Sequence, residues 1–191
     1  PTSANIPLTA NYRRSLVPGG TYFFTVVTHQ RRPLFDEERA RTFLRIALAE
    51  VKSHRPFFID AIVLLPDHLH CVWTIPTDDC DYSTRWRQIK KRFTQQYLSE
   101  GFPEGQISSG RQRQGDRGIW QRRFYEHTVR DEQDLKRCVD YLHLNPVKHG
   151  LVEQVCDWPL SSFHLYVQRG EYQINWGGSP EMYGDEWLRT E

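Results

Sequence analysis

The sequence predicts an α+β protein built on an antiparallel sheet, and three observations support this class. Runs rich in β-branched and aromatic residues alternate with stretches whose apolar residues recur at helical spacing. Two of the strand-like runs are joined only by Pro66-Asp67, which is short enough for a hairpin. The 191 residues contain no internal repeat and suit one domain with a single core.

The first half of the chain predicts a strand, a helix and a hairpin. Residues 21–28 form a β-branched and aromatic run, which predicts the first strand. A helix with one apolar stripe then begins at Asp36 and ends before Pro56. Residues 57–65 and 69–75 form the two arms of the hairpin.

The next part of the chain predicts a helix, a loop and a fourth strand. Asp81 can cap a helix at about residues 84–98, in which basic residues lie between aromatic ones. Residues 101–118 are polar and rich in glycine, which predicts a mobile surface loop. The fourth strand is expected at residues 119–129.

A third helix follows and is expected to end near Asn145, because Pro146 disfavours helical geometry in the residue before it. The order of elements matches a ferredoxin-like antiparallel sheet with helices packed on one face, plus a C-terminal helical extension and tail. We expect a single domain at residues 1–191, with its core at about 11–150 and the extension at about 151–191.

The composition argues against several classes of protein. No apolar stretch approaches the ~20 residues that span a bilayer, and the first residues do not resemble a signal peptide, so the expected compartment is the cytoplasm. The 4 cysteines form no Cys-x-x-Cys pair, which disfavours a zinc ribbon or a disulfide scaffold.

Charge is unevenly distributed although the net charge is only +1. Basic residues gather at 13–14 with 31–32, at 85–92 and at 111–123, with aromatic residues among them in the last two segments, whereas the C-terminal stretch is acidic. Such clusters suit a polyanion whose bases can stack, because phosphate attraction and base stacking come from different residue types. A solvated helix face stays open as the alternative for any single cluster.

Two histidines, separated by one residue, lie at the start of the second hairpin arm. In His68-Leu69-His70 both imidazoles point to one face of the strand. Strand alternation alone often produces this spacing, so a metal site is predicted only if other residues complete it. Tyr141 and Asn145 can do so, because residues four positions apart on a helix lie on one face.

These four residues together allow a defined chemistry. An asparagine carbonyl can complete a ligand set with two imidazoles and leave coordination positions open, as a catalytic cation requires. A tyrosine held near such a cation can attack a phosphodiester and become a covalent phosphotyrosine.

Three strings in the same order resemble one protein family. They are LPDHLHCVW (65–73), WQRRFYEH (120–127) and DYLHLNPVKHG (140–150), and they are similar to the REP-associated tyrosine transposases. That family is a single-tyrosine branch of the HUH endonucleases, whose histidine-hydrophobe-histidine motif residues 68–70 match. The likeness extends from about residue 11 to about residue 176.

The resemblance implies a nuclease and transferase that acts on single-stranded DNA at repetitive extragenic palindromes (REP), bacterial hairpin elements flanked by a short tetranucleotide. Tyr141 would attack the scissile phosphate, leaving a 5′-phosphotyrosine and a free 3′-OH. His68, His70 and Asn145 would hold Mg²⁺ or Mn²⁺. The family match also favours Tyr141 over Tyr125, which has no amide partner one helical turn away.

The expected partner is single-stranded DNA that carries a hairpin, bound at the nucleoid of a bacterial cell. The candidates for DNA contacts are Arg13, Arg14, Trp86, Arg87, Lys90, Lys91, Arg122, Arg123 and Lys148. Core packing is the alternative for Trp86, and the favoured interpretation for Phe93. A further hypothesis is that the acidic C-terminal residues fold over the basic groove and compete with DNA.

Two other functions stay open. One is a non-catalytic protein that binds hairpin DNA and uses a metal only for structure. The other is a replication or relaxase nickase of the wider HUH group, which the one tyrosine in the helical motif disfavours. A monomer in solution is expected, with a dimer as the alternative.

Overall fold

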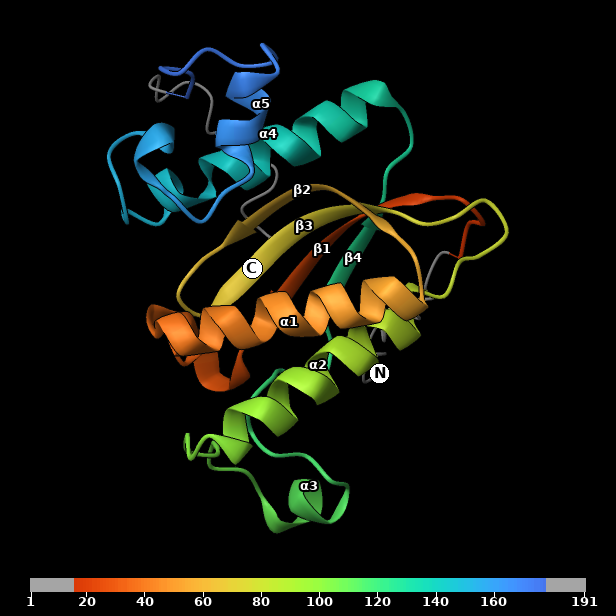
Figure 1. Ribbon diagram of the computed structural model, residues 1–191, viewed down its shortest axis with the longest axis vertical. Helices are drawn as coiled ribbons and strands as arrows, with labels where there is room; N and C mark the ends of the chain where they lie inside the picture. Colours follow the sequence, from red (N-terminus) through yellow and green to blue (C-terminus); the bar gives the residue numbers. More distant parts are fainter. Residues whose placement is uncertain (1–15, 178–191) are drawn as a thin grey trace, which may run out of the picture.

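The computed structural model describes residues 16–177, which form a four-stranded antiparallel sheet with helices on both faces (Figure 1). The strands are β1 (Thr21–Val27), β2 (Phe58–Leu64), β3 (His68–Thr74) and β4 (Tyr125–Thr128). They lie in the order β2-β3-β1-β4, and each neighbouring pair is antiparallel. The predicted α+β class and ferredoxin-like sheet are confirmed.

Helices cover both faces of this sheet. The longer ones are α1 (Glu38–His54), α2 (Tyr82–Ser99) and α4 (Glu132–Lys148), and the short ones are α3 (Ser109–Arg113) and α5 (Phe163–Gln168). Three 3-10 turns are η1 (His29–Arg31), η2 (Leu34–Asp36) and η3 (Val155–Asp157). As predicted, α1 and α2 share one face, and the structure places α4 and α5 on the opposite face (Figure 1).

Strand alternation divides the core into two layers. Phe24 and Trp73 point toward α1 and α2, where the Trp73 ring stacks on Trp86 of α2 at 4.2 Å between ring centres. Phe23 and Val72, the neighbours of those residues on β1 and β3, point toward α4 instead. The sheet is therefore buried on both faces, and α4 lies directly over the face that carries the histidine pair.

The helix α4 continues past the proline at which the sequence predicted its end. It runs through Pro146 to Lys148, and the N–H of His149 still donates to the carbonyl of Asn145 at 3.0 Å. The prediction was wrong because proline removes only one backbone donor, while the buried residues Leu144, Asn145 and Pro146 hold the last turn against the core.

The fourth strand is shorter than predicted. Only Tyr125–Thr128 pair with β1, although Trp120 forms an isolated bridge with Thr28. Ile119 and Trp120 leave the sheet and enter the core beside α2, where the Trp120 ring lies 5.0 Å from that of Phe93. Their apolar character marks core packing rather than strand pairing.

The segment 101–118 folds back on itself around the short helix α3. At its base Gly105 and Gly118 cross so closely that neither position has room for a side chain. Within it, Arg111 pairs with Asp116 at 2.7 Å. The predicted loop is thus a closed excursion with its own internal contacts.

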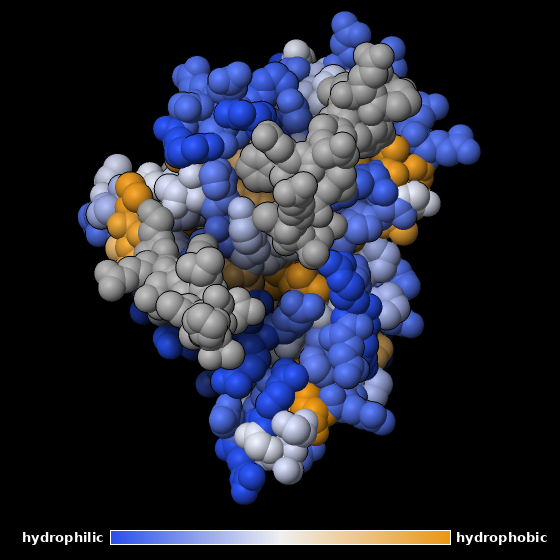
Figure 2. All heavy atoms as spheres, turned by 180° about the vertical axis from the view of Figure 1, so that it is seen from behind, coloured by the Kyte–Doolittle hydropathy of each residue, from blue (hydrophilic) through white to orange (hydrophobic). Residues whose placement is uncertain are grey.

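Hydrophilic residues cover most of the face seen in Figure 2, and hydrophobic residues gather there only in small separate patches. None of the helices within residues 16–177 combines the length and the apolar composition that a bilayer span requires.

Candidate active site

The two histidines of the sequence motif lie on β3 and point toward α4. His70 is paired with Thr25 of β1, and Thr25 is paired in turn with Tyr125 of β4. Directly opposed residues of antiparallel strands share a face, so these three side chains form one row across the sheet. The His68 and His70 rings are both buried, and their centres are 4.9 Å apart. The predicted pair of imidazoles therefore forms.

An acidic partner orients His68. The Nδ1 of His68 donates to the Asp67 carboxylate at 2.5 Å, and Arg31 pairs with the same carboxylate at 3.2 Å. Burial would raise the pKa of Asp67, but the hydrogen bond from His68 and the contact with Arg31 outweigh burial and lower the pKa. Asp67 therefore stays ionised and leaves Nε2 as the nitrogen that His68 would present to a ligand.

A hydroxyl orients His70 in the same way. The Oγ1 of Thr25 lies 2.9 Å from Nδ1 of His70, so His70 would also coordinate through Nε2. The sequence analysis did not identify Thr25 or Arg31 as residues that support the histidines. Only the strand register, which pairs Thr25 with His70, could have identified the threonine.

The helix α4 brings Tyr141 to this site. The Tyr141 ring centre lies 5.4 Å from the His70 ring and 5.8 Å from the Phe23 ring, both in edge contacts. Lys148 donates from Nζ to the Tyr141 hydroxyl at 3.2 Å and also lies 4.8 Å from its ring centre. Tyr141 thus has a cation at its oxygen and a histidine beside its ring.

Tyr125, the other tyrosine considered as a nucleophile, has a different environment. It is half-buried on β4, and burial raises its pKa, with added contributions from Cys138 and Glu126. A raised pKa disfavours the phenolate that attacks phosphorus. The surroundings of the two rings therefore favour Tyr141.

Asn145 lies one turn after Tyr141 and is fully buried. The next turn ends at His149, whose ring centre is 5.1 Å from that of His68. Since the N–H of His149 bonds to the carbonyl of Asn145, the end of α4 that carries Asn145 lies against the histidine pair.

The chemistry of these donors fits a divalent cation. The Nε2 atom of His68 is buried and makes no hydrogen bond within residues 16–177, a state that a bound metal would satisfy. Two imidazole nitrogens and an amide oxygen form a mixed set with room for oxygen ligands from a substrate.

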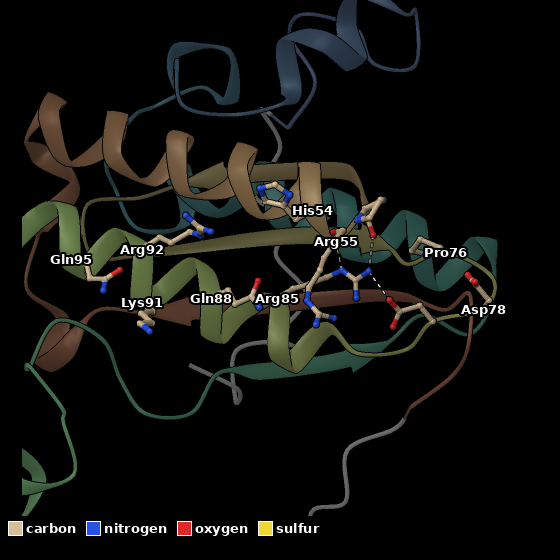
Figure 3. A pocket seen from close by; sticks show the side chains of 11 residues that line it. His54, Arg55, Pro76, Asp78, Arg85, Gln88, Lys91, Arg92 and Gln95 are labelled. Carbon is tan, nitrogen blue, oxygen red and sulfur yellow. Dashed lines mark hydrogen bonds and ion pairs between the residues drawn. The ribbon is translucent and has the colours of Figure 1, made fainter.

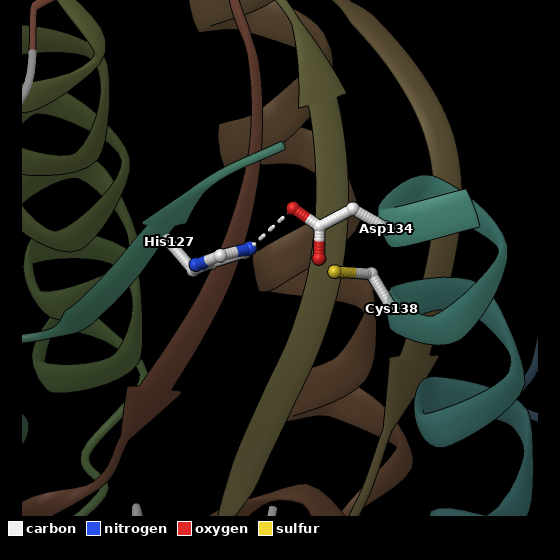
Figure 4. A group of neighbouring side chains, drawn as sticks. All are labelled: His127, Asp134 and Cys138. Carbon is white, nitrogen blue, oxygen red and sulfur yellow. Dashed lines mark hydrogen bonds and ion pairs between the residues drawn. The ribbon is translucent and has the colours of Figure 1, made fainter. Parts of the chain in front are cut away.

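A second cluster of possible metal ligands joins the first half of α4 to β4 (Figure 4). The ligand atoms of His127, Asp134 and Cys138 all lie within 4.8 Å of one another. The Oδ2 of Asp134 accepts from Nε2 of His127 at 2.9 Å and from the backbone N–H of Arg130 at 3.0 Å. Burial would raise the pKa of Asp134, but these partners lower it to about 2.

The pKa of the thiol in this cluster is shifted in the opposite direction. Burial raises the pKa of Cys138 to about 12, so the sulfur is protonated at neutral pH. With its carboxylate already bonded to the His127 ring and to Arg130, the cluster holds the start of α4 against β4. It thereby sets where the helix carries Tyr141.

The candidates for DNA contacts are scattered over the molecule. Trp86 is fully buried and stacked on Trp73, so the prediction that it offers a stacking surface to DNA was wrong. Phe93 is also core, as favoured from the sequence. Arg13, Arg14 and the acidic C-terminal residues after 177 lie outside the described part of the chain.

The other basic candidates divide between two faces. Arg87 and Lys91 are exposed on α2, on the side of the sheet opposite to the histidines. Lys90 reaches the carbonyl of Gln121 at 2.9 Å. Arg122 and Arg123 are exposed in the segment before β4. Of these candidates, Lys148 contacts Tyr141.

A large hollow of about 1020 Å³ lies beside α1 and α2 (Figure 3). His54, Arg55, Lys91 and Arg92 contribute to its walls. Arg85 also lines it but is fully buried, with bonds of 2.8 Å to Asp79 and to the carbonyl of Pro56. This hollow belongs to the α1 and α2 side of the sheet and is separate from the histidine site.

Comparison with known proteins gives consistent matches. A model of the family described as "Transposase IS200 like" matches residues 17–145. A REP-associated tyrosine transposase of Escherichia coli (strain K12) is 46% identical over 169 residues, which cover 88% of this chain and 92% of the relative. A relative from Haemophilus influenzae is 43% identical over 173 residues, or 91% of this chain and 96% of its own.

One solved structure is also similar in both fold and sequence. It is described as a REP-associated tyrosine transposase bound to a REP hairpin. It has a TM-score of 0.73 and 45% identity, and the match covers 90% of this chain and 93% of that one.

Proposed function

The chain belongs to the IS200-like transposases and, within them, to the REP-associated tyrosine transposases, and from this premise we propose that it cleaves and rejoins single-stranded DNA at REP hairpins through a covalent bond to Tyr141. The observation that carries the proposal is the placement of Tyr141, whose hydroxyl lies beside Lys148 and whose ring lies against the ring of His70. The solved relative described as bound to a REP hairpin supports a hairpin as the DNA partner of this chain.

Tyr141 is the nucleophile in this proposal. Its phenolic oxygen forms a bond to phosphorus while the bond from phosphorus to the 3′ oxygen breaks, which leaves a 5′-phosphotyrosine. The phenol gives up one proton and the departing 3′ oxygen takes one up, so the charges balance. Attack by a 3′-OH on the phosphotyrosine runs the same step backward and rejoins the strands without an external energy source.

Lys148 stabilises the attacking group. The phenolate that attacks phosphorus carries a full negative charge, and an ammonium group 3.2 Å from that oxygen lowers its energy. The helix places this cation two turns after the tyrosine, so one rigid element fixes both groups.

His68, His70 and Asn145 would hold the divalent cation, Mg²⁺ or Mn²⁺. When bound, such an ion polarises the phosphate and offsets the charge that develops on it. Asp67 and Thr25 hold the Nδ1 atoms of the two histidines and so leave their Nε2 atoms for the cation.

The protein acts as one domain and as a monomer in this proposal. Tyr141 of α4 packs against His70 of its own chain, which supports activity without a partner subunit. The C-terminal extension is attached to the core, because His143 of α4 lies 2.9 Å from the hydroxyl of Ser162 and Trp158 donates to the carbonyl of Leu64 at 3.0 Å.

The deciding experiment is a search for a covalent adduct. The protein is incubated with single-stranded DNA that carries a REP hairpin and its flanking bases, in the presence of Mn²⁺. We expect the wild type to form an adduct that maps to Tyr141, and Tyr141→Phe to form none. Tyr97→Phe is the matched control, since Tyr97 is buried on α2 at the opposite face of the sheet.

An adduct that persists in Tyr141→Phe would refute the assignment. If the adduct is lost in Tyr125→Phe instead, the role of nucleophile passes to Tyr125. Hairpin binding without any adduct would favour a non-catalytic DNA-binding protein.

A further inference from the structure

His127, Asp134 and Cys138 bring three kinds of metal-binding atom to one place (Figure 4). The imidazole comes from β4, whereas the carboxylate and the thiol come from the first two turns of α4. The three ligand atoms lie within 4.8 Å of one another, and Nε2 of His127 is 2.9 Å from Oδ2 of Asp134. Ligands that share one tetrahedral Zn²⁺ ion lie about 3.3–3.8 Å apart. Small movements of these side chains therefore suffice for all three to reach one ion.

One oxygen of the Asp134 carboxylate is buried without a donor. Oδ2 accepts from His127 and from Arg130, but Oδ1 makes no hydrogen bond within residues 16–177. In Figure 4 this second oxygen points toward the sulfur of Cys138. Buried polar atoms normally have a partner, and a cation between the oxygen and the sulfur would supply one.

The cluster can be reached from the edge of the sheet. Asp134 and Cys138 are fully buried, but His127 lies on the edge strand β4 and keeps 20% of its side chain exposed. The Arg130 side chain, which is 70% exposed, bonds to Oδ2 of Asp134 at 3.2 Å. Ion pairs of such exposed groups are weak, so a divalent cation can displace this guanidinium from the carboxylate.

The donor atoms select the class of cation. Thiolate and imidazole ligands suit Zn²⁺, whereas Mg²⁺ and Ca²⁺ require ligand sets made of oxygen atoms. Burial first, and then the charge of Asp134, raises the pKa of Cys138. A cation bound between the two groups would offset that charge, and a thiol that coordinates a cation loses its proton.

We propose that His127, Asp134 and Cys138 form a second metal site, selective for Zn²⁺, that fastens the helix of Tyr141 to the edge strand of the sheet. The ion takes the place of the thiol proton, which leaves to solvent, and no electron is transferred. Three protein ligands leave the fourth tetrahedral position to water. The inference goes beyond the proposed function and does not depend on it, because binding of the ion requires neither DNA nor the Tyr141 hydroxyl.

The test uses Co²⁺, which occupies Zn²⁺ sites and absorbs in the near ultraviolet when a thiolate binds it. The full chain is freed of metal with a chelator, kept reduced, and titrated with Co²⁺. We expect a thiolate-to-cobalt band that saturates, disappears when Zn²⁺ is added, and persists in excess Mg²⁺. The set of His68, His70 and Asn145 contains no sulfur, so the band reports only on a cysteine.

Two ligand variants assign the band to the cluster. Cys138→Ser should abolish the band, whereas Cys156→Ser, a matched change at a half-buried cysteine in η3, should keep it. His127→Gln should weaken Co²⁺ binding by more than the about 10- to 100-fold that loss of a supporting partner costs, because it removes a ligand itself. A band that is absent from the wild type, or that survives in Cys138→Ser, would overturn the proposal.

Arg130→Gln gives a test in the opposite direction. Arg130 is exposed, so the variant should fold, and its loss removes the competitor for the Asp134 carboxylate. We expect Co²⁺ to bind about twofold to fivefold more tightly, the usual worth of an exposed ion pair. Arg113→Gln, a change at an exposed arginine of α3, should leave the affinity unchanged. Weaker or unchanged binding in Arg130→Gln would contradict a cation at Asp134.

Thermal unfolding tests whether the ion fastens α4 to β4. We expect Zn²⁺ to raise the midpoint of the wild type more than that of Cys138→Ser, because an ion that binds only the folded state stabilises it. Zn²⁺ at the histidine pair would raise both midpoints equally. Equal shifts in the two proteins would therefore overturn this role of the ion.

Discussion

Lys148 lies over Tyr141 in two ways at once, with Nζ 3.2 Å from the hydroxyl oxygen and 4.8 Å from the centre of the ring. The two residues are seven positions apart on α4, which brings them to the same side of the helix two turns apart. A cation in this position stabilises negative charge on the oxygen and also contacts the face of the ring.

We expect Lys148→Met to slow adduct formation by about 10- to 100-fold, because a hydrogen bond to a charged group contributes about 1.5–3 kcal/mol. Single-turnover rates with hairpin DNA measure the effect. Lys136→Met is the control, since Lys136 lies on the same helix but pairs with Asp140 on the exposed side. A wild-type rate in Lys148→Met would show that the phenolate does not need this cation.

Asp67→Asn should weaken metal binding. The neutral amide holds the His68 ring less strongly than the carboxylate does, and loss of such a partner usually costs about 10- to 100-fold in metal affinity. Calorimetric titration with Mn²⁺ measures this directly, with the exposed Asp36→Asn as the control. Unchanged affinity in Asp67→Asn would place the metal away from His68.

Trp86→Ala should destabilise the fold by about 3–5 kcal/mol, because it removes a fully buried indole that stacks on Trp73. Urea unfolding measures this loss. The milder Trp86→Phe keeps an aromatic ring in the core, and we expect it to bind hairpin DNA with wild-type affinity. A tenfold loss of DNA affinity in folded Trp86→Phe would contradict the core assignment.

Stability should fall as the pH is lowered from about 6.5 toward 3. Burial lowers the pKa of His143 from 6.5 to about 3, so between these values the unfolded chain binds a proton that the folded protein does not. The resulting slope is up to about 1.4 kcal/mol per pH unit.

Urea unfolding at several pH values tests this slope. We expect His143→Gln to show a shallower decline over the same range, while His54→Gln, a change at an exposed histidine, should keep the wild-type decline. Equal slopes in all three proteins would mean that His143 takes up its proton in the folded state.

The sequence allowed the sheet and the relation of Tyr141 to Asn145 to be predicted, because both depend on local periodicity. Alternating residues define strands, and a spacing of four defines one helix face. The pairing of His70 with Thr25 could not be predicted, since these residues are 45 positions apart and meet only through the register of β1 and β3.

Trp86 and Pro146 show the second limit. An aromatic residue among basic ones has the same local pattern whether it stacks on a base or on Trp73 across the sheet–helix interface. Pro146 is a helix breaker by local rules, yet tertiary packing keeps it inside α4. In both cases a distant partner decides the outcome.

Gly105 and Gly118 cross at the base of the excursion between them, so the length of this excursion can change without changing the rest of the fold. Because its two ends are fixed together, residues added at the tip would extend a loop that is already closed, and each doubling of loop length costs only about 0.6 kcal/mol. Gly115, in the turn after α3, has open space around it. This excursion is therefore the natural point for inserting a purification tag or a fluorescent reporter without disturbing the sheet.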